Sequence, residues 1–247
     1  MKKQTLPQIS ALFAERYRSL SPFLSIATCE EVQALLNPFL TQQRKEKIAT
    51  VLEKRLTSIE IACEAPTDIH NALAIVRTGE ALGVTTIHII DHELRKNEGK
   101  GTMQGSGVWS TVEFYRQFED FNQRDAVSKP LLVGLDPHAD HSISDIPIDE
   151  PLCLIFGNEK RGLTEEAKTA CDMLCTIPMF GMAESFNLSV SAGIVLYELT
   201  TKKRATLNGN SEISDEERQL ETTRAYIRTL GYENALRIVR DLKDRQT

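Results

Sequence analysis

The sequence predicts an α/β fold in which a mostly parallel sheet is flanked by helical segments at both ends of the chain. Short apolar runs typical of strands alternate with segments of helical periodicity through the middle of the 247 residues. Before and after this region the periodicity is helical only. We therefore divide the chain into an N-terminal helical extension (1–55), a central domain (56–200) and a C-terminal helical tail (201–247).

The first 55 residues are predicted to be helical because their apolar residues recur at helical spacing, as Val32, Leu35 and Leu36 do. Pro22 and Pro38 are expected to break this region into pieces, since proline interrupts a helix.

The first half of the central domain reads as alternating strands and helices. In order, the pattern predicts a strand at 58–63, a helix at 71–82 that ends at Gly83, a strand at 85–91, a short strand near Val112, a helix at 118–127 and a strand at 130–135.

The second half begins with a fully apolar strand, Leu152–Phe156, followed by a glycine-containing turn. Thr164 is predicted to cap a helix that has two glutamates in its first turn. The remaining predicted elements are a strand at 175–178, a polar loop, an apolar helix at about 189–199, and a pair of tail helices at 214–240 separated by Gly231.

The composition is that of an ordinary globular protein, with 41% hydrophobic and 26% charged residues. No apolar run is long enough to span a membrane, and the first ten residues lack the apolar region of a signal peptide. The five cysteines form no CxxC pair, so we expect reduced thiols in a cytoplasmic protein and no metal site.

The net charge of −6 argues against indiscriminate binding to nucleic acid. Residues 1–60 nevertheless hold nine basic and six acidic side chains, and basic clusters flank the central domain at 44–55 and 202–204. Each cluster fits either a solvated helix face or a surface that contacts phosphates.

Two nucleotide-binding motifs are excluded by spacing. Gly157 and Gly162 have the glycine spacing of a Walker A motif, but Leu163 stands where that motif requires lysine. The glycines between 99 and 107 fail the GxGxxG pattern because Gln104 occupies the last glycine position.

Three motifs instead resemble the TrmH (SpoU) branch of the SPOUT RNA methyltransferases, and they occur in the order that the family shows. The first is an asparagine followed six residues later by an arginine, Asn71 and Arg77. The second is the turn GNEKRGL at 157–163, and the third is IPMFGMAESFNLSV at 177–190. Phe186 and Leu188 depart from the common leucine and valine but keep the apolar bulk.

The resemblance implies a SPOUT-type fold whose C-terminal part is threaded into a trefoil knot, which periodicity cannot predict. It also implies a homodimer and S-adenosyl-L-methionine as the methyl donor. By motif match, the cofactor-binding residues are Gly134, Gly157, Ile177, Met179, Phe186 and Leu188.

The reaction implied by the resemblance is transfer of a methyl group to a ribose 2′-hydroxyl of RNA. Its catalytic residues are expected to be Arg77, Asn71, Glu159, Ser185 and Asn187. Because a guanidinium keeps its proton, we expect Arg77 to grip phosphate and stabilise the emerging oxyanion, with the proton leaving to a phosphate oxygen or to water.

Each of these residues also has a structural interpretation. Arg77 could form a salt bridge with Glu80 or Glu159, and Glu159 could be a simple carboxylate at the start of a helix. Asn71, Asn187 and Ser185 could be helix caps. Trp109, after a substrate-side loop at 105–108, fits either stacking on RNA or packing in the core.

The expected substrate is tRNA, at a guanosine of the D loop, since the helical first 55 residues do not resemble the ribosomal-protein-like domain of the branch's rRNA enzymes. Three alternatives stay open: an rRNA 2′-O-methyltransferase, a catalytically silent RNA-binding relative, and a base methyltransferase of the wider superfamily.

Overall fold

The computed structural model describes residues 17–91, 109–124 and 129–245. The chain divides into two units. One is continuous, from Arg55 to Glu212, and contains every predicted site residue. The other combines the two ends of the chain, up to Lys54 and from Ile213 onward.

The continuous unit is built on a seven-stranded sheet in which every pair of neighbouring strands is parallel. The strand order is β3-β2-β1-β6-β4-β7-β5. The strands are β1 (Leu56–Glu64), β2 (Val84–Ile90), β3 (Thr111–Tyr115), β4 (Leu131–Leu135), β5 (His141–Ser142), β6 (Leu152–Phe156) and β7 (Met173–Thr176). The predicted α/β class with a parallel sheet is confirmed.

The central strand β6 is buried along its whole length, as its uninterrupted apolar sequence predicts for a strand covered on both faces. It pairs with β1 on one side and β4 on the other, so that Phe156 lies opposite both Cys63 and Leu135. Since the strands are parallel, β4, β6 and β7 all end at the same edge of the sheet.

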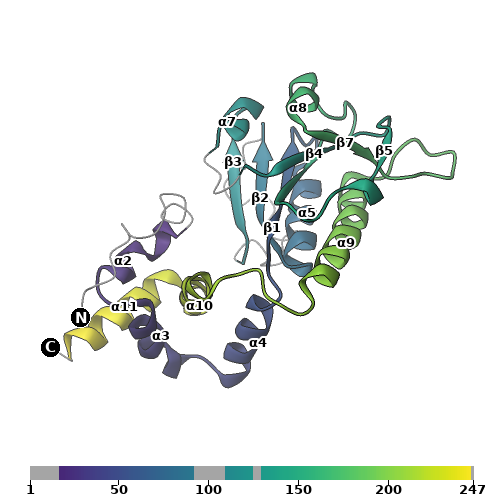
Figure 1. Cartoon of the computed structure of the whole chain (residues 1–247). Helices are drawn as coiled ribbons and strands as arrows, with labels where there is room; N and C mark the ends of the chain where they lie inside the picture. The colour runs from purple at the N-terminus through teal and green to yellow at the C-terminus, as the bar shows by residue number, and fades with distance from the viewer. Residues whose placement is uncertain (1–16, 92–108, 125–128, 246–247) are drawn as a thin grey trace. The chain divides into compact units, whose positions relative to one another are not determined.

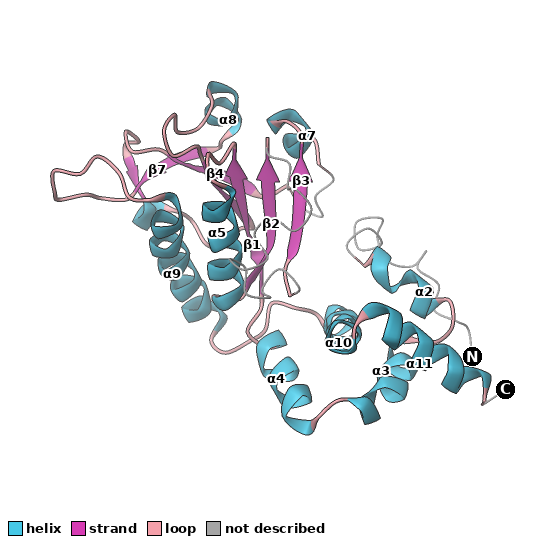
Figure 2. Cartoon of the chain, turned by 180° about the vertical axis from the view of Figure 1, so that it is seen from behind, coloured by secondary structure: helices cyan, strands magenta, loops and turns pink. Residues whose placement is uncertain are grey.

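Helices cover both faces of the sheet (Figure 1, Figure 2). α5 (Ile69–Ala81) and α9 (Leu188–Leu207) lie side by side and share a large apolar core with one face. α7 (Phe118–Asn122) and α8 (Glu165–Ala170) cover the other face with a smaller core. The loop between β7 and α9 projects from the sheet (Figure 1).

Most predicted elements lie within two residues of their observed positions. The helix predicted at 118–127 ends at Asn122, and residues 125–127 of that prediction lie outside the described residues. The strand predicted at 175–178 is Met173–Thr176, because Pro178 cannot donate to the ladder. The helix predicted at about 189–199 begins at Leu188 and runs to Leu207. The two-residue strand β5, with the 3-10 helix η5 (Ile143–Asp145) after it, was not predicted.

Among its described residues, the second unit contains helices and no strands. Its elements are η2 (Arg18–Leu20), α2 (Ser21–Leu24), α3 (Cys29–Leu36), η3 (Asn37–Phe39), α4 (Gln42–Leu52), α10 (Asp215–Leu230) and α11 (Tyr232–Asp244). Pro22 lies in the first turn of α2 and Pro38 in the first turn of η3. Both prolines therefore stand where a new helix begins, at the positions where breaks were expected.

The two ends of the chain pack together inside this helical unit. The buried Tyr17 hydroxyl donates a 2.9 Å hydrogen bond to Glu221 of α10, and the Phe23 ring meets Tyr232 of α11 edge to face. α3 and α10 both begin with capping boxes, formed by Thr28 with Glu31 and by Ser214 with Glu217. Gly231 separates α10 from α11, as predicted.

No helix in the described ranges is both long and apolar enough to cross a lipid bilayer.

Candidate active site

A cavity of about 760 Å³ opens where β4, β6 and β7 end. This edge of a parallel sheet is the usual place for a ligand site, and the volume suits a nucleoside-sized molecule. The cavity is lined by three segments of the chain and the start of α9: 135–138, 156–162 with Lys168, 175–179 with 184–186, and Leu188 with Ser191.

The turn after β6 forms the first wall and depends on two glycines. Asn158 and Gly162 exchange backbone hydrogen bonds of 3.0 and 2.9 Å, which close the turn. Gly162 has a φ of +68°, a left-handed conformation that side chains disfavour. A Cβ atom on Gly157 would lie 2.4 Å from backbone atoms of Gly162 and Leu163, so this position has no room for any side chain.

Glu159, at the tip of this turn, holds the start of α5. Its Oε1 accepts a 2.9 Å hydrogen bond from Asn71 Nδ2, and its Oε2 accepts one of 2.7 Å from the Thr67 backbone N–H. Burial raises the pKa of Glu159, but the two donors outweigh it and the pKa lies below its ordinary value. The carboxylate is therefore ionised, with a hydrogen bond on each oxygen.

Asn71 itself is not a helix cap, because Asp68 caps α5 by accepting a hydrogen bond from the His70 N–H. Asn187, in contrast, does cap its helix: its Oδ1 accepts from the Ser189 N–H at 2.9 Å. Its amide nitrogen faces Asn71 Oδ1 at 3.4 Å, a long hydrogen bond. Asn187, Asn71 and Glu159, distant in sequence, thus form one chain of polar contacts.

Arg77 and Ser185 stand outside this chain of contacts. Arg77 is exposed on α5 and does not line the cavity. Neither expected salt bridge forms within the described residues: Glu80 lies 3.8 Å from Arg55, and Glu159 bonds Asn71 and Thr67. Ser185 is exposed and lines the cavity, in the loop before α9.

Five of the six residues expected to bind the cofactor line the cavity: Gly157, Ile177, Met179, Phe186 and Leu188. Gly134 does not. It lies inside β4, where a Cβ atom would come within 2.8 Å of the Leu163, Cys171 and Leu174 side chains. This close packing requires a glycine there whether or not a ligand binds.

Sequence reasoning missed two charged residues of the cavity, Asp136 and Lys168. Lys168 Nζ lies 2.8 Å from Asp136 Oδ2. Burial raises the pKa of Asp136, but the Lys168 ammonium and the His138 N–H outweigh it, so the pKa is lowered. The only available signal was that Asp136 directly follows an apolar strand; nothing local indicates its partner 32 residues later.

The glycine-rich segment at 99–107 lies outside the described residues. Trp109 is half-buried, and its carbonyl oxygen accepts a 3.4 Å hydrogen bond from Arg55. This contact fixes the backbone at Trp109. It does not distinguish between the two roles expected of the side chain, which are stacking on RNA and packing in the core.

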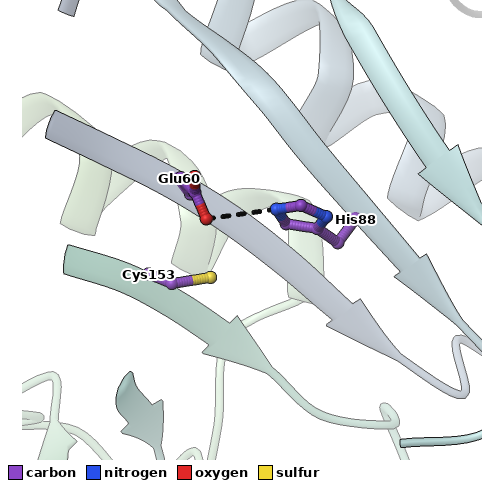
Figure 3. A group of neighbouring side chains, drawn as sticks. All are labelled: Glu60, His88 and Cys153. Carbon is purple, nitrogen blue, oxygen red and sulfur yellow. Dashed lines mark hydrogen bonds and ion pairs between the residues drawn. The ribbon is translucent and has the colours of Figure 1, made fainter. Parts of the chain in front are cut away.

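A second group of titratable side chains lies on the sheet face that α7 covers. Glu60, His88 and Cys153 come from neighbouring strands β1, β2 and β6, and their ligand atoms all lie within 4.8 Å of one another (Figure 3). Glu60 Oε2 is 3.2 Å from His88 Nε2 and accepts a 3.0 Å hydrogen bond from Arg124. On the other side, His88 Nδ1 lies 3.3 Å from Glu113.

The residues Glu60, His88, Glu113 and Arg124, here called the histidine network, contact one another through their acidic and basic side chains. Burial lowers the pKa of His88, but the contacts with Glu113 and Glu60 outweigh it and raise the pKa. The contact with His88 lowers the pKa of Glu113 to about 2. The two carboxylates thus contact the His88 ring and the Arg124 guanidinium, and burial raises the pKa of the Cys153 thiol, which stays protonated. These donors do not fit a metal ion.

Comparisons with known proteins agree with this geometry. Residues 58–197 match the SpoU rRNA Methylase family. The tRNA (guanosine(18)-2'-O)-methyltransferase of Borreliella burgdorferi is 30% identical over 173 residues, 69% of this chain and 78% of that protein. The Escherichia coli K12 protein of the same name is 31% identical over 186 residues, 71% of this chain and 79% of its own length.

Solved structures show the same architecture. The TrmH/SpoU tRNA modifying enzyme of A. aeolicus superimposes with a TM-score of 0.63 at 28% identity, over 75% of this chain and 96% of that one. The SpoU methyltransferase AviRb of Streptomyces viridochromogenes, in complex with AdoMet, superimposes with a TM-score of 0.52 at 27% identity, over 62% and 59%. The family match covers more than half of the sequence, and the chain belongs to the SpoU rRNA methylase family.

Proposed function

We propose that this protein is an S-adenosyl-L-methionine-dependent RNA 2′-O-ribose methyltransferase that acts on tRNA, at a guanosine of the D loop. The observation that carries the proposal is the chain of contacts from Glu159 through Asn71 to Asn187, placed beside the cavity at the ends of β4, β6 and β7. Three separate family motifs contribute one residue each to it.

The cavity fits the cofactor. Apolar side chains from Ile177, Met179 and Leu188 face it, and the bare backbone at Gly157 allows close approach of a ligand. Bound S-adenosylmethionine supplies a methyl group already activated on a sulfonium. The chain's own residues must therefore bind the ribose, hold its hydroxyl in line, and accommodate the proton that leaves it.

Glu159 acts as a positioning residue, because both of its oxygens already accept hydrogen bonds. It holds the Asn71 amide, whose Oδ1 faces Asn187. Arg77 supplies positive charge to a phosphate and to the oxygen as it loses its proton. Ser185, exposed at the mouth of the cavity, orients the substrate.

Arg77 takes part in this reaction in a homodimer, in which it approaches the cavity of the other subunit. It is exposed on α5, which packs against α9, and α9 carries an exposed apolar strip. Val190 and Tyr197, seven residues apart on one helix face, are 48% and 66% exposed, and Phe180 and Met182 in the preceding loop are almost completely exposed. An apolar surface of this kind favours a second copy of the chain, whose α5 then lies near the cavity. The trefoil threading of this region is part of the same proposal.

Two observations support tRNA as the substrate. The B. burgdorferi and E. coli relatives are named for guanosine 18 of tRNA. In this chain, the first six residues of α4 are all polar, and Arg44 and Lys47 are exposed on it, as for a helix that contacts phosphates. The runner-up is rRNA, because a 23S rRNA (uridine(2479)-2'-O)-methyltransferase of S. viridochromogenes is 30% identical over 57% of this chain. We place the enzyme in the cytoplasm, consistent with its five free thiols.

The test is methylation of unmodified tRNA transcripts with methyl-labelled S-adenosylmethionine, followed by alkaline hydrolysis and mass-spectrometric mapping. We expect label in an alkali-resistant dinucleotide that contains the D-loop guanosine, since only 2′-O-methylation protects the adjacent phosphodiester. Label on an alkali-sensitive mononucleotide would mean base methylation, and label only in rRNA would select the runner-up. A protein that binds RNA without transferring label would be the silent relative.

A further inference from the structure

An ion pair that no family motif contains joins two walls of the cavity. Asp136 directly follows β4, and Lys168 lies in the last turn of α8; both line the cavity. Their charged atoms are 2.8 Å apart, with the Asp136 side chain 9% exposed and the Lys168 side chain 31% exposed. A half-buried pair at this distance is a charge-assisted hydrogen bond, stronger than an exposed surface pair.

The Asp136 carboxylate also organises the turn that follows β4. While Oδ2 contacts Lys168, Oδ1 accepts a 2.8 Å hydrogen bond from the His138 N–H. The Asp136 backbone is fixed on both sides: its N–H donates to Cys175 of β7, and its carbonyl oxygen accepts from Ala139. The cavity wall formed by 136–138 is therefore held by the Asp136 carboxylate together with two backbone hydrogen bonds.

Lys168 connects this turn to the glycine turn. α8 begins directly after 157–163, and its first turn is fastened to β1, where the buried Glu64 carboxylate accepts from both the N–H and the hydroxyl of Thr164. The second partner of Lys168, Glu165, is 3.7 Å away and 91% exposed, so Asp136 is the dominant contact. Lys168 therefore links the 136–138 wall to α8, whose position is already fixed by the hydrogen bonds between Thr164 and Glu64.

We propose that the Lys168–Asp136 pair is a positioning device for S-adenosylmethionine. The pair holds the 136–138 wall in its binding conformation before the cofactor arrives, so that cofactor binding does not have to order this wall. The inference rests on the proposed function, because it needs that cofactor in this cavity. Preorganisation of a binding loop raises affinity by removing the entropic cost of ordering it. Loss of the pair is therefore expected to weaken binding and leave the methyl-transfer step intact.

Isothermal titration calorimetry on the full-length protein tests the proposal, with S-adenosylmethionine and S-adenosylhomocysteine as the two ligands. Lys168→Met and Asp136→Asn should each raise the Kd for both ligands about fivefold, the scale of a half-buried ion pair. The double variant should be no weaker than the single ones, and Lys168→Arg should restore the affinity to within about twofold. In the tRNA assay, KM for the cofactor should rise while kcat stays unchanged.

The matched control is Lys202→Met. Lys202 is 35% exposed and pairs with Glu198 at 3.0 Å on α9, away from the cavity, so its loss should leave both affinities unchanged. The thermal midpoints of the ligand-free variants should stay within about 2 °C of the wild type, because one partly exposed pair contributes little to stability.

Wild-type affinity in Lys168→Met would overturn the proposal. So would a change confined to S-adenosylmethionine, which would mean that Lys168 acts on the sulfonium charge and not on the wall, or a failure of Lys168→Arg to restore binding. If the wild type itself binds neither ligand, the proposed function falls, and the inference falls with it.

Discussion

Asn71 shows at the scale of one residue how a side chain is left available for function. An asparagine in the first turn of a helix usually caps it, but Asp68 already does so in α5. The Asn71 amide is therefore used elsewhere: its nitrogen donates to Glu159 and its oxygen faces Asn187. In the proposed mechanism the site depends on the orientation of this amide, which the hydrogen bond to Glu159 fixes.

Glu159→Gln tests this dependence. A glutamine amide offers one acceptor oxygen to the two donors, Asn71 Nδ2 and the Thr67 N–H, and turns its own NH₂ group toward one of them. We expect single-turnover methylation to slow about 10- to 100-fold, since one contact that orients the site is lost. Cofactor affinity measured by calorimetry should change less than about threefold. Glu166→Gln, on the exposed first turn of α8, is the control and should behave as the wild type.

Arg77→Ala should abolish turnover almost completely while the affinity for S-adenosylmethionine is retained, because Arg77 does not line the cavity of its own subunit. Arg77→Lys keeps the charge but loses the planar fork, and we expect partial activity. The measurement is labelled-methyl transfer to tRNA alongside calorimetry with the cofactor. Substantial activity in Arg77→Ala would contradict the proposed role.

The candidate site could be predicted from the sequence only as far as motifs reach. Glu159 and Asn187 stand in recognisable motifs, and the structure brings both to Asn71. Asp136 and Lys168 belong to no motif, and an ion pair between residues 32 positions apart leaves no periodic signal. Long-range pairing of this kind is decided by the tertiary structure.

At the scale of elements, the shape of the turn that joins β6 to α8 is set by close contact between backbone atoms. Gly157 lies against Gly162 and Leu163 so closely that no rotamer change could admit a methyl group. The two ends of the turn are closed by hydrogen bonds between Asn158 and Gly162. The turn therefore has one accessible shape, which suits it to present Glu159.

Gly157→Ala is expected to destabilise the protein by about 1–3 kcal/mol, the range for overpacking where the neighbours cannot move. Cofactor affinity should fall as well, because the turn is a wall of the cavity. Urea denaturation and calorimetry measure the two effects. Gly181→Ala is the control: its added Cβ would meet nothing within 4 Å, and unchanged stability is expected. Equal stabilities of the two variants would refute the close-approach argument.

Sequence patterns predicted the elements best where a single period dominates. The buried strand β6 was placed correctly because its five residues form one unbroken apolar run, and the helix α5 because its apolar residues follow the helical period. β5 has two residues and shows no period at all. Of the helix predicted at 118–127, the helical part within the described residues ends at Asn122, and among its residues Phe118 and Phe121 are the ones that pack into the core.

For the whole molecule, the histidine network makes stability depend on pH. The folded pKa of Glu113, about 2, lies below its ordinary value, so its stabilising contribution is present above about pH 4.5 and is lost as the pH falls toward 2. The folded pKa of His88 is raised, so its contribution is present below about pH 6.5 and is lost as the pH rises through the folded value. Both contributions are complete only between these limits.

His88→Gln should therefore cost most between about pH 5 and 6, by about 2–4 kcal/mol, because the variant leaves Glu60 and Glu113 without their shared cation. The cost should shrink steadily at higher pH. Urea denaturation of the wild type and the variant at a series of pH values measures the difference. A cost that is independent of pH would show that His88 is neutral in the folded protein.

The fold class could be predicted because alternating strands and helices admit few arrangements. The packing of the two chain ends against each other could not be predicted. No local pattern indicates that Tyr17 meets Glu221, 204 residues away, or that Gln33 meets Thr223. The order of the sheet, which places β6 between β1 and β4, is likewise set by packing and not by any single segment.

The packing of the two chain ends has a consequence during synthesis. Residues 55–212 are contiguous and form a compact unit of their own, whereas α3 packs mainly against α10 and α11, which are made only after residue 212. α2 and α3 must therefore wait, with Phe23 and Val32 uncovered, until residues 213–244 have been translated. A nascent chain truncated before residue 213 should carry a completed sheet and an N-terminal segment that chaperones still recognise.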